Sequence, residues 1–232
     1  MEYYKNCISL GCFCGTAASM GKFGLRSHSG PFDWYFSDFN SVLKIIETDF
    51  SDFMKKENLW FDDSDCKVFY DTKYGFKCGH DVDRDFEAEY PSIYQKYMRR
   101  AEQFKKDIKF PTCFIRTVKD EEEICFIEEN QKYIYNVLRK ENGNNNIIFL
   151  LNRKLKNMSE DFLWFKLDID EYIGKTYEMR YMFSASGPFL EYCQNILSPE
   201  DIKHNIEFDR RHLRMGARVS VLLGKAKEIK FL

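Results

Sequence analysis

The stretch NCISLGCFCGTA, residues 6–17, places three cysteines where a strand could deliver a reactive sulfur. The apolar run before Gly11 predicts a short buried strand, and the small residues from Cys14 onward predict a helix. Cys14 would then lie just beyond the carboxyl end of a strand, where α/β proteins bind ligands. The helix dipole and its free amides favour a thiolate, so we expect the pKa of Cys14 to fall. Cys7 and Cys12 look structural, and the competing interpretation of Cys14 is a small cysteine buried under the sheet.

A thiol nucleophile needs a base, and the chain offers four histidines. His80 is followed by Asp81, which could orient or charge its imidazole. His212 follows Asp209 by three positions, and an aspartate there can hold the imidazole in one tautomer. Each histidine is a candidate base, with the competing interpretation of a surface or helix-capping residue. The other two are His28, in a Ser- and Gly-rich loop, and His204.

Two charged residues stand among apolar neighbours. Asp33 lies in PFDWY, and burying an unpaired carboxylate is costly, so it is either paired or functional. Arg116 lies in CFIRTV, a predicted buried strand, and we expect it to pair with a buried carboxylate, with Asp33 as the candidate partner. The competing interpretation is a purely structural ion pair. Candidate substrate-binding residues are Arg26, Trp34 and Arg116.

The elements that must position these residues follow from apolar spacing. A strand, a helix and a strand within about 40 residues form a βαβ unit, which implies parallel pairing and a right-handed crossover. We therefore predict an α/β fold, a single domain over residues 1–232 with a mainly parallel sheet flanked by helices. Predicted helices cover residues 39–55, 89–108 (with Pro91 in the first turn), 120–140, 190–197 and 213–225; predicted strands cover 7–10, 112–118, 147–151 and 162–169, with a small hairpin or meander over 59–80.

Composition narrows the classes of function. The 232 residues are 44% hydrophobic and carry a net charge of −2, so no global basic field exists to hold a nucleic acid, and no such partner is expected. No apolar run reaches membrane-spanning length, and the first residues lack a secretory signal, so we expect a cytoplasmic protein with reduced cysteines. Phosphate-binding glycine motifs and zinc-type cysteine pairs are missing, so no cofactor and no metal are expected, although Cys66, Cys78 and His80 could be drawn as a metal site.

Several sequence islands, taken in order, resemble a known family. ISLGCFCGTA resembles an S-L-G-x-x-C-x-x-A start, and it is followed by GLRSHSGPFDW, the HD pair at 80–81, YPSIYQKYMRRAEQF and FIRT. This order resembles an uncharacterised, mostly bacterial family of papain-like cysteine peptidases, over about residues 6–152. The family label is itself a predicted activity. The resemblance implies a thiol hydrolase in which the cysteine is Cys14, the histidine is His80 and the aspartate is Asp33.

Two other functions stay open. A strand, G-x-x-nucleophile and late D-x-x-H order is similar to that of SGNH esterases, which would make Cys14, His212 and Asp209 the catalytic set. This chain has G-C-F-C where that class has G-D-S. The third hypothesis is a non-catalytic module that binds a carbohydrate or a protein through its aromatic loop, residues 31–39. The substrate of a hydrolase could be a peptide, an ester or a glycan-linked acyl group.

Overall fold

The main sheet has four parallel strands, in the order β1-β5-β6-β7. The computed structural model describes residues 3–62, 68–79, 81–82, 85–156, 159–170 and 179–207. The predicted α/β class with a mainly parallel sheet is confirmed. The strands are β1 (Asn6–Ser9), β5 (Thr112–Thr117), β6 (Asn146–Leu151) and β7 (Leu163–Lys166).

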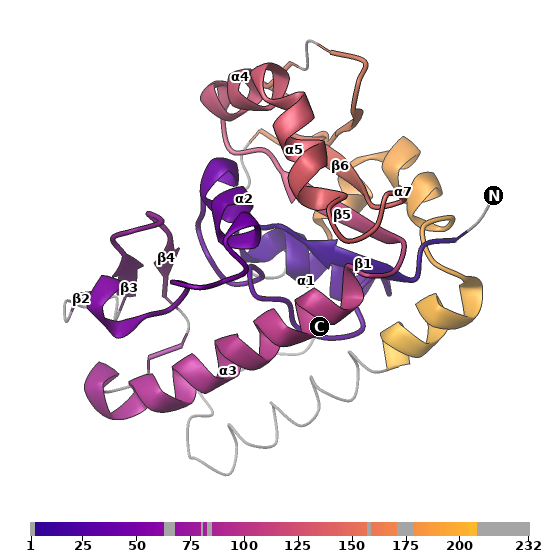
Figure 1. The fold of residues 1–232 in the computed structure, drawn as a ribbon. Coiled ribbons are helices and arrows are strands. Elements are labelled where there is room, and N and C mark those ends of the chain that lie inside the picture. Colours follow the sequence, from indigo (N-terminus) through magenta and orange to yellow (C-terminus); the bar gives the residue numbers. More distant parts are fainter. Residues whose placement is uncertain are drawn as a thin grey trace.

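Helices cover both faces of this sheet, which explains why β5 is buried along its whole length and β6 from its second residue on, rather than at alternate positions. One face packs on α2 (Phe39–Glu47), α3 (Phe86–Asp107), α4 (Glu121–Glu129) and α5 (Gln131–Leu138), and Figure 1 shows α3 as the longest of these. The other face packs on α1 (Cys14–Lys22), the 3-10 turn η2 (Met182–Ala185) and α7 (Gly187–Cys193). Two separate apolar layers result. The first lies between the sheet and α2, α3, α4 and α5, and the second lies between the sheet and α1, η2 and α7.

The connections after β1 and β5 leave the sheet toward opposite faces. The chain leaves β1 into α1, which packs on the second layer, whereas it leaves β5 into α4, which packs on the first. A parallel sheet with such a reversal, called a switch point, has a crevice outside the carboxyl ends of the two strands, and ligands bind there. The turn that precedes Cys14 therefore lies where this fold is expected to bind a ligand.

A second, antiparallel sheet confirms the predicted meander over 59–80. Its strands are β2 (Leu59–Asp62), β3 (Val68–Asp71) and β4 (Lys77–Cys78), preceded by the 3-10 turn η1 (Lys56–Asn58). The small sheet lies beside the N-terminal end of α3 (Figure 1), where Phe61 stacks on Phe86 with ring centroids 5.2 Å apart. A backbone bridge from Phe36 to Lys77 ties it to the loop that follows α1.

Two helix predictions were wrong in extent. The predicted helix over 39–55 ends at Glu47, because Asp49 and Phe50 adopt left-handed φ angles of 53° and 61°. The apolar spacing beyond that point is real, but Phe50 and Phe53 fill the core from a loop. The predicted helix over 120–140 is two helices, since Asn130 interrupts it and its side chain bonds the Phe126 carbonyl.

Other boundaries moved less. Helix α3 starts at Phe86 rather than 89, because the Asp85 side chain caps it by accepting from the Ala88 amide at 3.2 Å. Pro91 consequently lies inside the helix instead of in its first turn. The predicted helix over 213–225 lies outside the described residues. Among the residues described, no helix has the length and apolar character needed to cross a membrane.

Candidate functional site

The turn between β1 and α1 is fastened by its neighbours. Gly11 has a φ of +82°, and a Cβ placed on it would lie only 2.9 Å from Ser37 Oγ and 3.1 Å from Arg116 Nη1, so the position requires glycine. The Ser37 amide donates to the Cys12 carbonyl at 3.1 Å. Thr16 Oγ1 donates to the Gly11 carbonyl at 3.1 Å. The chain just before Cys14 is thereby held in one conformation.

The Arg116 side chain connects the segments that surround this turn. It is fully buried, and its Nε and Nη2 each bond one oxygen of Glu123 at 2.8 Å. Its Nη1 donates to the Leu10 carbonyl at 2.8 Å, and its Nη2 donates to the Ser37 carbonyl at 2.6 Å. Burial works to lower the pKa of Arg116, but the Glu123 carboxylate outweighs it and raises that pKa. The guanidinium thus links β1, β5, α4 and the loop after α1.

The expected pairing of Arg116 with Asp33 is wrong. Asp33 is buried in the loop after α1, where its Oδ2 accepts from Arg26 Nη1 at 2.7 Å and from the Gly30 amide at 2.8 Å. The Arg26 guanidinium also lies 5.7 Å from the centre of the Trp34 ring. The two buried charges therefore have separate partners, each taken from nearby in the sequence. Arg26 and Trp34 form a unit with Asp33, and a role for them in substrate binding stays a prediction.

Asp33 keeps one oxygen free for a further donor. Its Oδ1 is buried and has no hydrogen-bond partner among the described residues. The loop that carries it packs on the Gly11 turn, since the Phe32 carbonyl lies 3.5 Å from where a Gly11 Cβ would stand. A buried carboxylate oxygen without a donor is costly unless something fills the role. This oxygen could accept an N–H from an imidazole or from a substrate.

Cys14 is the first residue of α1, as the sequence predicted, but its acidity was predicted wrongly. Its N-cap residue, Phe13, offers no side-chain bond, and the first turn holds no acid. The side chain is half-buried against the second apolar layer. Burial raises the pKa of the Cys14 thiol, and the bond from its own backbone amide opposes this without reversing it. We therefore expect the thiol of Cys14 to be protonated near neutral pH.

The neighbouring cysteines are more deeply placed. Burial raises the pKa of Cys12 to about 12, although Arg116 works against the shift. Cys7 is paired in register with Cys113, and burial raises its pKa well above the ordinary value. Of the three cysteines between residues 6 and 17, only Cys14 reaches solvent to an appreciable extent.

Only some of the candidate bases and their partner acids lie among the described residues. His80, His212 and Asp209 lie outside the described residues. Asp81 is described, and it bonds the side chains of Lys96 and Tyr97, with Cys78 Sγ at 3.6 Å. Burial would raise the pKa of Asp81, but the bonds from Lys96 and Tyr97 outweigh it and lower that pKa. A charged, fixed carboxylate therefore stands next to His80 in the chain.

His28 lies at the opposite end of the sheet from Cys14. Its Nε2 lies 2.9 Å from Asp107 Oδ2, at the end of α3, and its Nδ1 lies 2.9 Å from Ser27 Oγ. The Asp107 carbonyl also accepts from Asn6, the first residue of β1. His28 thus lies at the amino ends of the strands, away from Cys14. His204 is exposed. Within the described ranges, no group of three His, Cys, Asp or Glu side chains is arranged to hold a metal ion.

A hollow of about 280 Å³ opens beside the carboxyl ends of the strands, between the starts of α2 and α4. Its lining includes Asp38, Lys119 and Glu123, and Lys119 bonds Asp38 across it. Lys119 and Asp120 also act on the pKa of Cys12, so the hollow lies near the turn. The aromatic loop, by contrast, is mostly interior. Phe32, Tyr35 and Phe39 are buried, Trp34 is half-buried and Phe36 is exposed.

Comparison with known proteins shows which family the chain belongs to. Residues 5–154 match a family described as "Putative papain-like cysteine peptidase (DUF1796)", which is more than half of the 232 residues. The chain belongs to this family. The matched residues include the whole switch point, with Cys14, Asp33 and Arg116, and they include His80 but neither Asp209 nor His212.

One curated relative of the chain is "Uncharacterized protein R408" of Acanthamoeba polyphaga mimivirus. It is 33% identical over 119 residues, which cover 42% of this chain and 53% of that protein. The chain therefore spans about half the length of the relative it matches. The relative is viral, so a mostly bacterial distribution stays a prediction. No solved structure matches the chain.

Two residues of this site were not predicted from the sequence. Glu123 is the partner of Arg116, and it stands seven positions later, at the third residue of α4, where its amide bonds the Asp120 cap at 2.9 Å. A buried arginine followed closely by an acid on the next helix was a signal for this pair. Ser37 binds both Arg116 and Cys12 through its backbone, and its Oγ also accepts from Arg116 Nη1 at 3.3 Å. The backbone part of this role leaves no signal in residue types.

Proposed function

We propose that this protein is a cysteine-dependent hydrolase in which Cys14 is the nucleophile and His80 is the base. The observation that carries the proposal is the place of Cys14, on the first residue of α1 at the switch point, accessible while Cys7 and Cys12 are buried. Membership of a family described as cysteine peptidases supports the same chemistry. Reactive groups in α/β folds are delivered from this position, at the carboxyl ends of strands.

The raised pKa of the Cys14 thiol determines when a base must remove its proton. A thiol that is neutral at rest requires a base that takes its proton during attack, rather than a preformed ion pair. The imidazole accepts the proton from Sγ as the sulfur bonds to the acyl carbon of the substrate. It then gives that proton to the departing amine or alcohol. Water hydrolyses the resulting thioester and restores the thiol.

The acid that orients the base has two candidates. Asp33 offers the buried Oδ1 that lacks a donor among the described residues, in a loop that packs on the Gly11 turn. Asp81 is the chain neighbour of His80, but Lys96 and Tyr97 already occupy both of its oxygens. The free oxygen favours Asp33 as the residue that accepts the imidazole N–H. Asp81 then serves to fix the chain beside His80.

The test is the rate at which iodoacetamide alkylates Cys14, followed by mass spectrometry between pH 5 and pH 10. We expect His80→Asn to slow alkylation at pH 7 by about tenfold and to leave a profile that follows the thiol alone. His204→Asn, which changes an exposed histidine, is the matched control and should have no effect. Loss of rate in His212→Asn instead would favour the SGNH-like alternative.

A second arm tests catalysis itself. Cleavage of fluorogenic peptides and of p-nitrophenyl esters should stop in Cys14→Ser and persist in Cys12→Ala. If His80→Asn leaves the alkylation rate of Cys14 unchanged at every pH, and neither substrate class is cleaved, the hydrolase proposal is wrong. The non-catalytic binding module would then be the surviving hypothesis.

A further inference from the structure

A second hollow lies at the end of the sheet away from Cys14. A cavity of about 430 Å³ is formed between the end of α2, the C-terminal part of α3 and the end of α5. Lys109 lies in the connection that leads into β5, and Lys140 lies in the connection that leads into β6. The cavity is therefore at the amino ends of the strands, whereas Cys14 follows the carboxyl end of β1. It belongs to a different site.

The floor of this cavity is apolar and partly open. Ile46, Phe50, Ile108 and Val137 belong to the first apolar layer, yet each keeps 5–9% of its surface exposed, whereas most members of that layer keep 0–2%. Phe104 completes the floor. Partly open core side chains lining one concavity of this size are typical of small-molecule sites.

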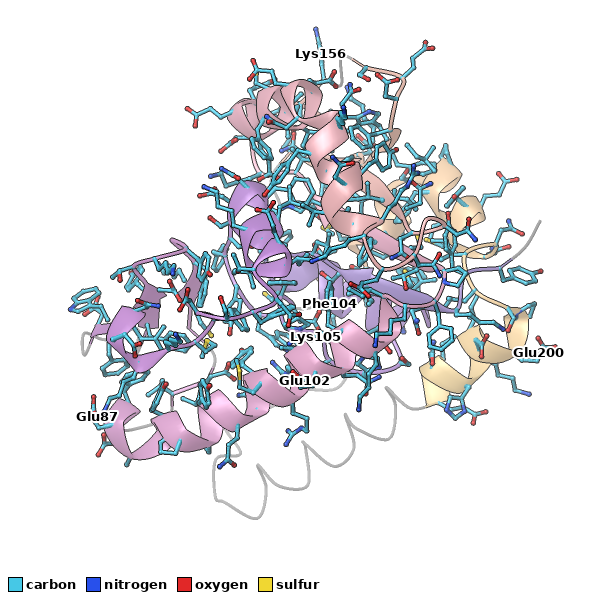
Figure 2. All side chains as sticks on the ribbon, in the orientation of Figure 1. Glu87, Glu102, Phe104, Lys105, Lys156 and Glu200 are labelled. Carbon is cyan, nitrogen blue, oxygen red and sulfur yellow. The ribbon has the colours of Figure 1, made fainter. Side chains whose placement is uncertain are left out.

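One wall is built by an unusual turn. Asp49 and Phe50 both have left-handed φ angles, which for residues other than glycine mark strained backbone that gathers at binding sites. Lys105 holds the turn in place, with its Nζ 3.0 Å from Asp49 Oδ2, 3.1 Å from Glu102 Oε1 and 5.9 Å from the centre of the Phe50 ring. Figure 2 shows Phe104 and Lys105 on the C-terminal half of α3, which borders the cavity.

The rim of the cavity also carries two lysines that take no part in the interactions of Lys105. Lys105 is neutralised by Asp49 and Glu102, but Lys109 and Lys140 have no ion pair with any described residue. Glu141 is the one other acid that lines the cavity. With Glu102 included, the acids and lysines around the cavity balance, so the positive charge is local to Lys109 and Lys140. Apolar walls beneath such a rim fit a ligand with one anionic end and an apolar body.

We propose that this cavity binds a small amphiphile with a single carboxylate, its apolar body on Ile46, Phe50 and Ile108 and its carboxylate between Lys109 and Lys140. Charge complementarity selects the anion, since two free ammonium groups at the mouth would each donate charge-assisted hydrogen bonds to it. The site is independent of the hydrolase chemistry, and a ligand here would act from the opposite edge of the sheet.

The experiment uses the full chain with ¹³C-labelled isoleucine and valine methyl groups, titrated with decanoate below its micelle concentration. We expect saturable shifts of the Ile46, Ile108 and Val137 methyls with one ligand per chain. Decanol and decyltrimethylammonium, which share the chain but not the charge, should bind about tenfold more weakly or not at all. Equal affinity for decanol would overturn the assignment of an anionic ligand, and the absence of a saturable shift would overturn the site.

Variants separate the rim from the floor. Lys109→Gln with Lys140→Gln should reduce decanoate affinity to the level of decanol, while Lys106→Gln, which alters a neighbouring exposed lysine that does not line the cavity, should leave it unchanged. Ile108→Trp should fill the cavity and abolish binding. Equal loss in the Lys106 variant would show that binding follows net charge alone. Cys14→Ser should bind decanoate normally, which keeps this result distinct from that of the hydrolase test.

Discussion

The pair of Arg116 and Glu123 offers the sharpest test of how the site is held. Replacing Glu123 with Leu removes both carboxylate oxygens that Arg116 bonds at 2.8 Å and leaves a guanidinium with no access to water. Breaking a buried ion pair from one side costs about 3–5 kcal/mol, because the remaining charge is uncompensated. We therefore expect Glu123→Leu to lower the free energy of unfolding by about 3–5 kcal/mol.

The double variant Arg116→Met with Glu123→Leu should be less damaging than the sum of the two single changes. It removes both charges, and what remains is the loss of donors to the Leu10 and Ser37 carbonyls, about 1–3 kcal/mol for each buried acceptor left unsatisfied. A favourable coupling energy between the two positions is the signature of a direct contact.

The assay is urea unfolding at pH 7, followed by tryptophan fluorescence and by far-ultraviolet circular dichroism. The shift in midpoint gives the change in stability when the slope is unchanged. A loss below about 1 kcal/mol in Glu123→Leu, or additive losses in the double variant, would refute the reasoning about the buried pair. Alkylation of Cys14 in the folded double variant should also change, because Arg116 no longer holds the Leu10 and Ser37 carbonyls beside the turn.

Three further predictions address the turn and its surroundings. Gly11→Ala should destabilise the fold by about 1–3 kcal/mol in thermal or urea unfolding, since its φ is +82° and a Cβ would meet Ser37 Oγ at 2.9 Å; an unchanged midpoint would contradict this geometry. Cys12, with a pKa of about 12, should resist iodoacetamide at pH 8 in the native protein while Cys14 reacts, and mass spectrometry of the labelled peptides decides between them. Asp81 has a lowered pKa in the folded state, so the stability it contributes is present above its ordinary pKa of 3.8 and is lost as the pH falls through the folded value. Asp81→Asn should therefore flatten the acid limb of the stability curve below about pH 4, and an unaltered limb would show that Asp81 is not held as a carboxylate.

The sequence by itself determined the local elements and their order. The apolar runs around Cys113 and Ile148 are strands because both faces of a parallel sheet are buried, and the connection between them is long enough for the helical crossover that parallel strands need. The position of Cys14 at the start of a helix followed from Gly11 and the small residues beyond it. Each of these inferences depends on neighbours within a few positions, where composition and spacing carry the information.

The tertiary structure decided which groups meet and what their surroundings do to them. Arg116 has Glu123 as its partner rather than Asp33, because α4 packs over the end of β5 while the loop after α1 carries its own arginine. Cys14 has a raised pKa where the helix start predicted a lowered one, because burial against the second apolar layer outweighs the amide that faces it. Burial of this kind arises only when distant segments pack together, and residue spacing along the chain does not encode it.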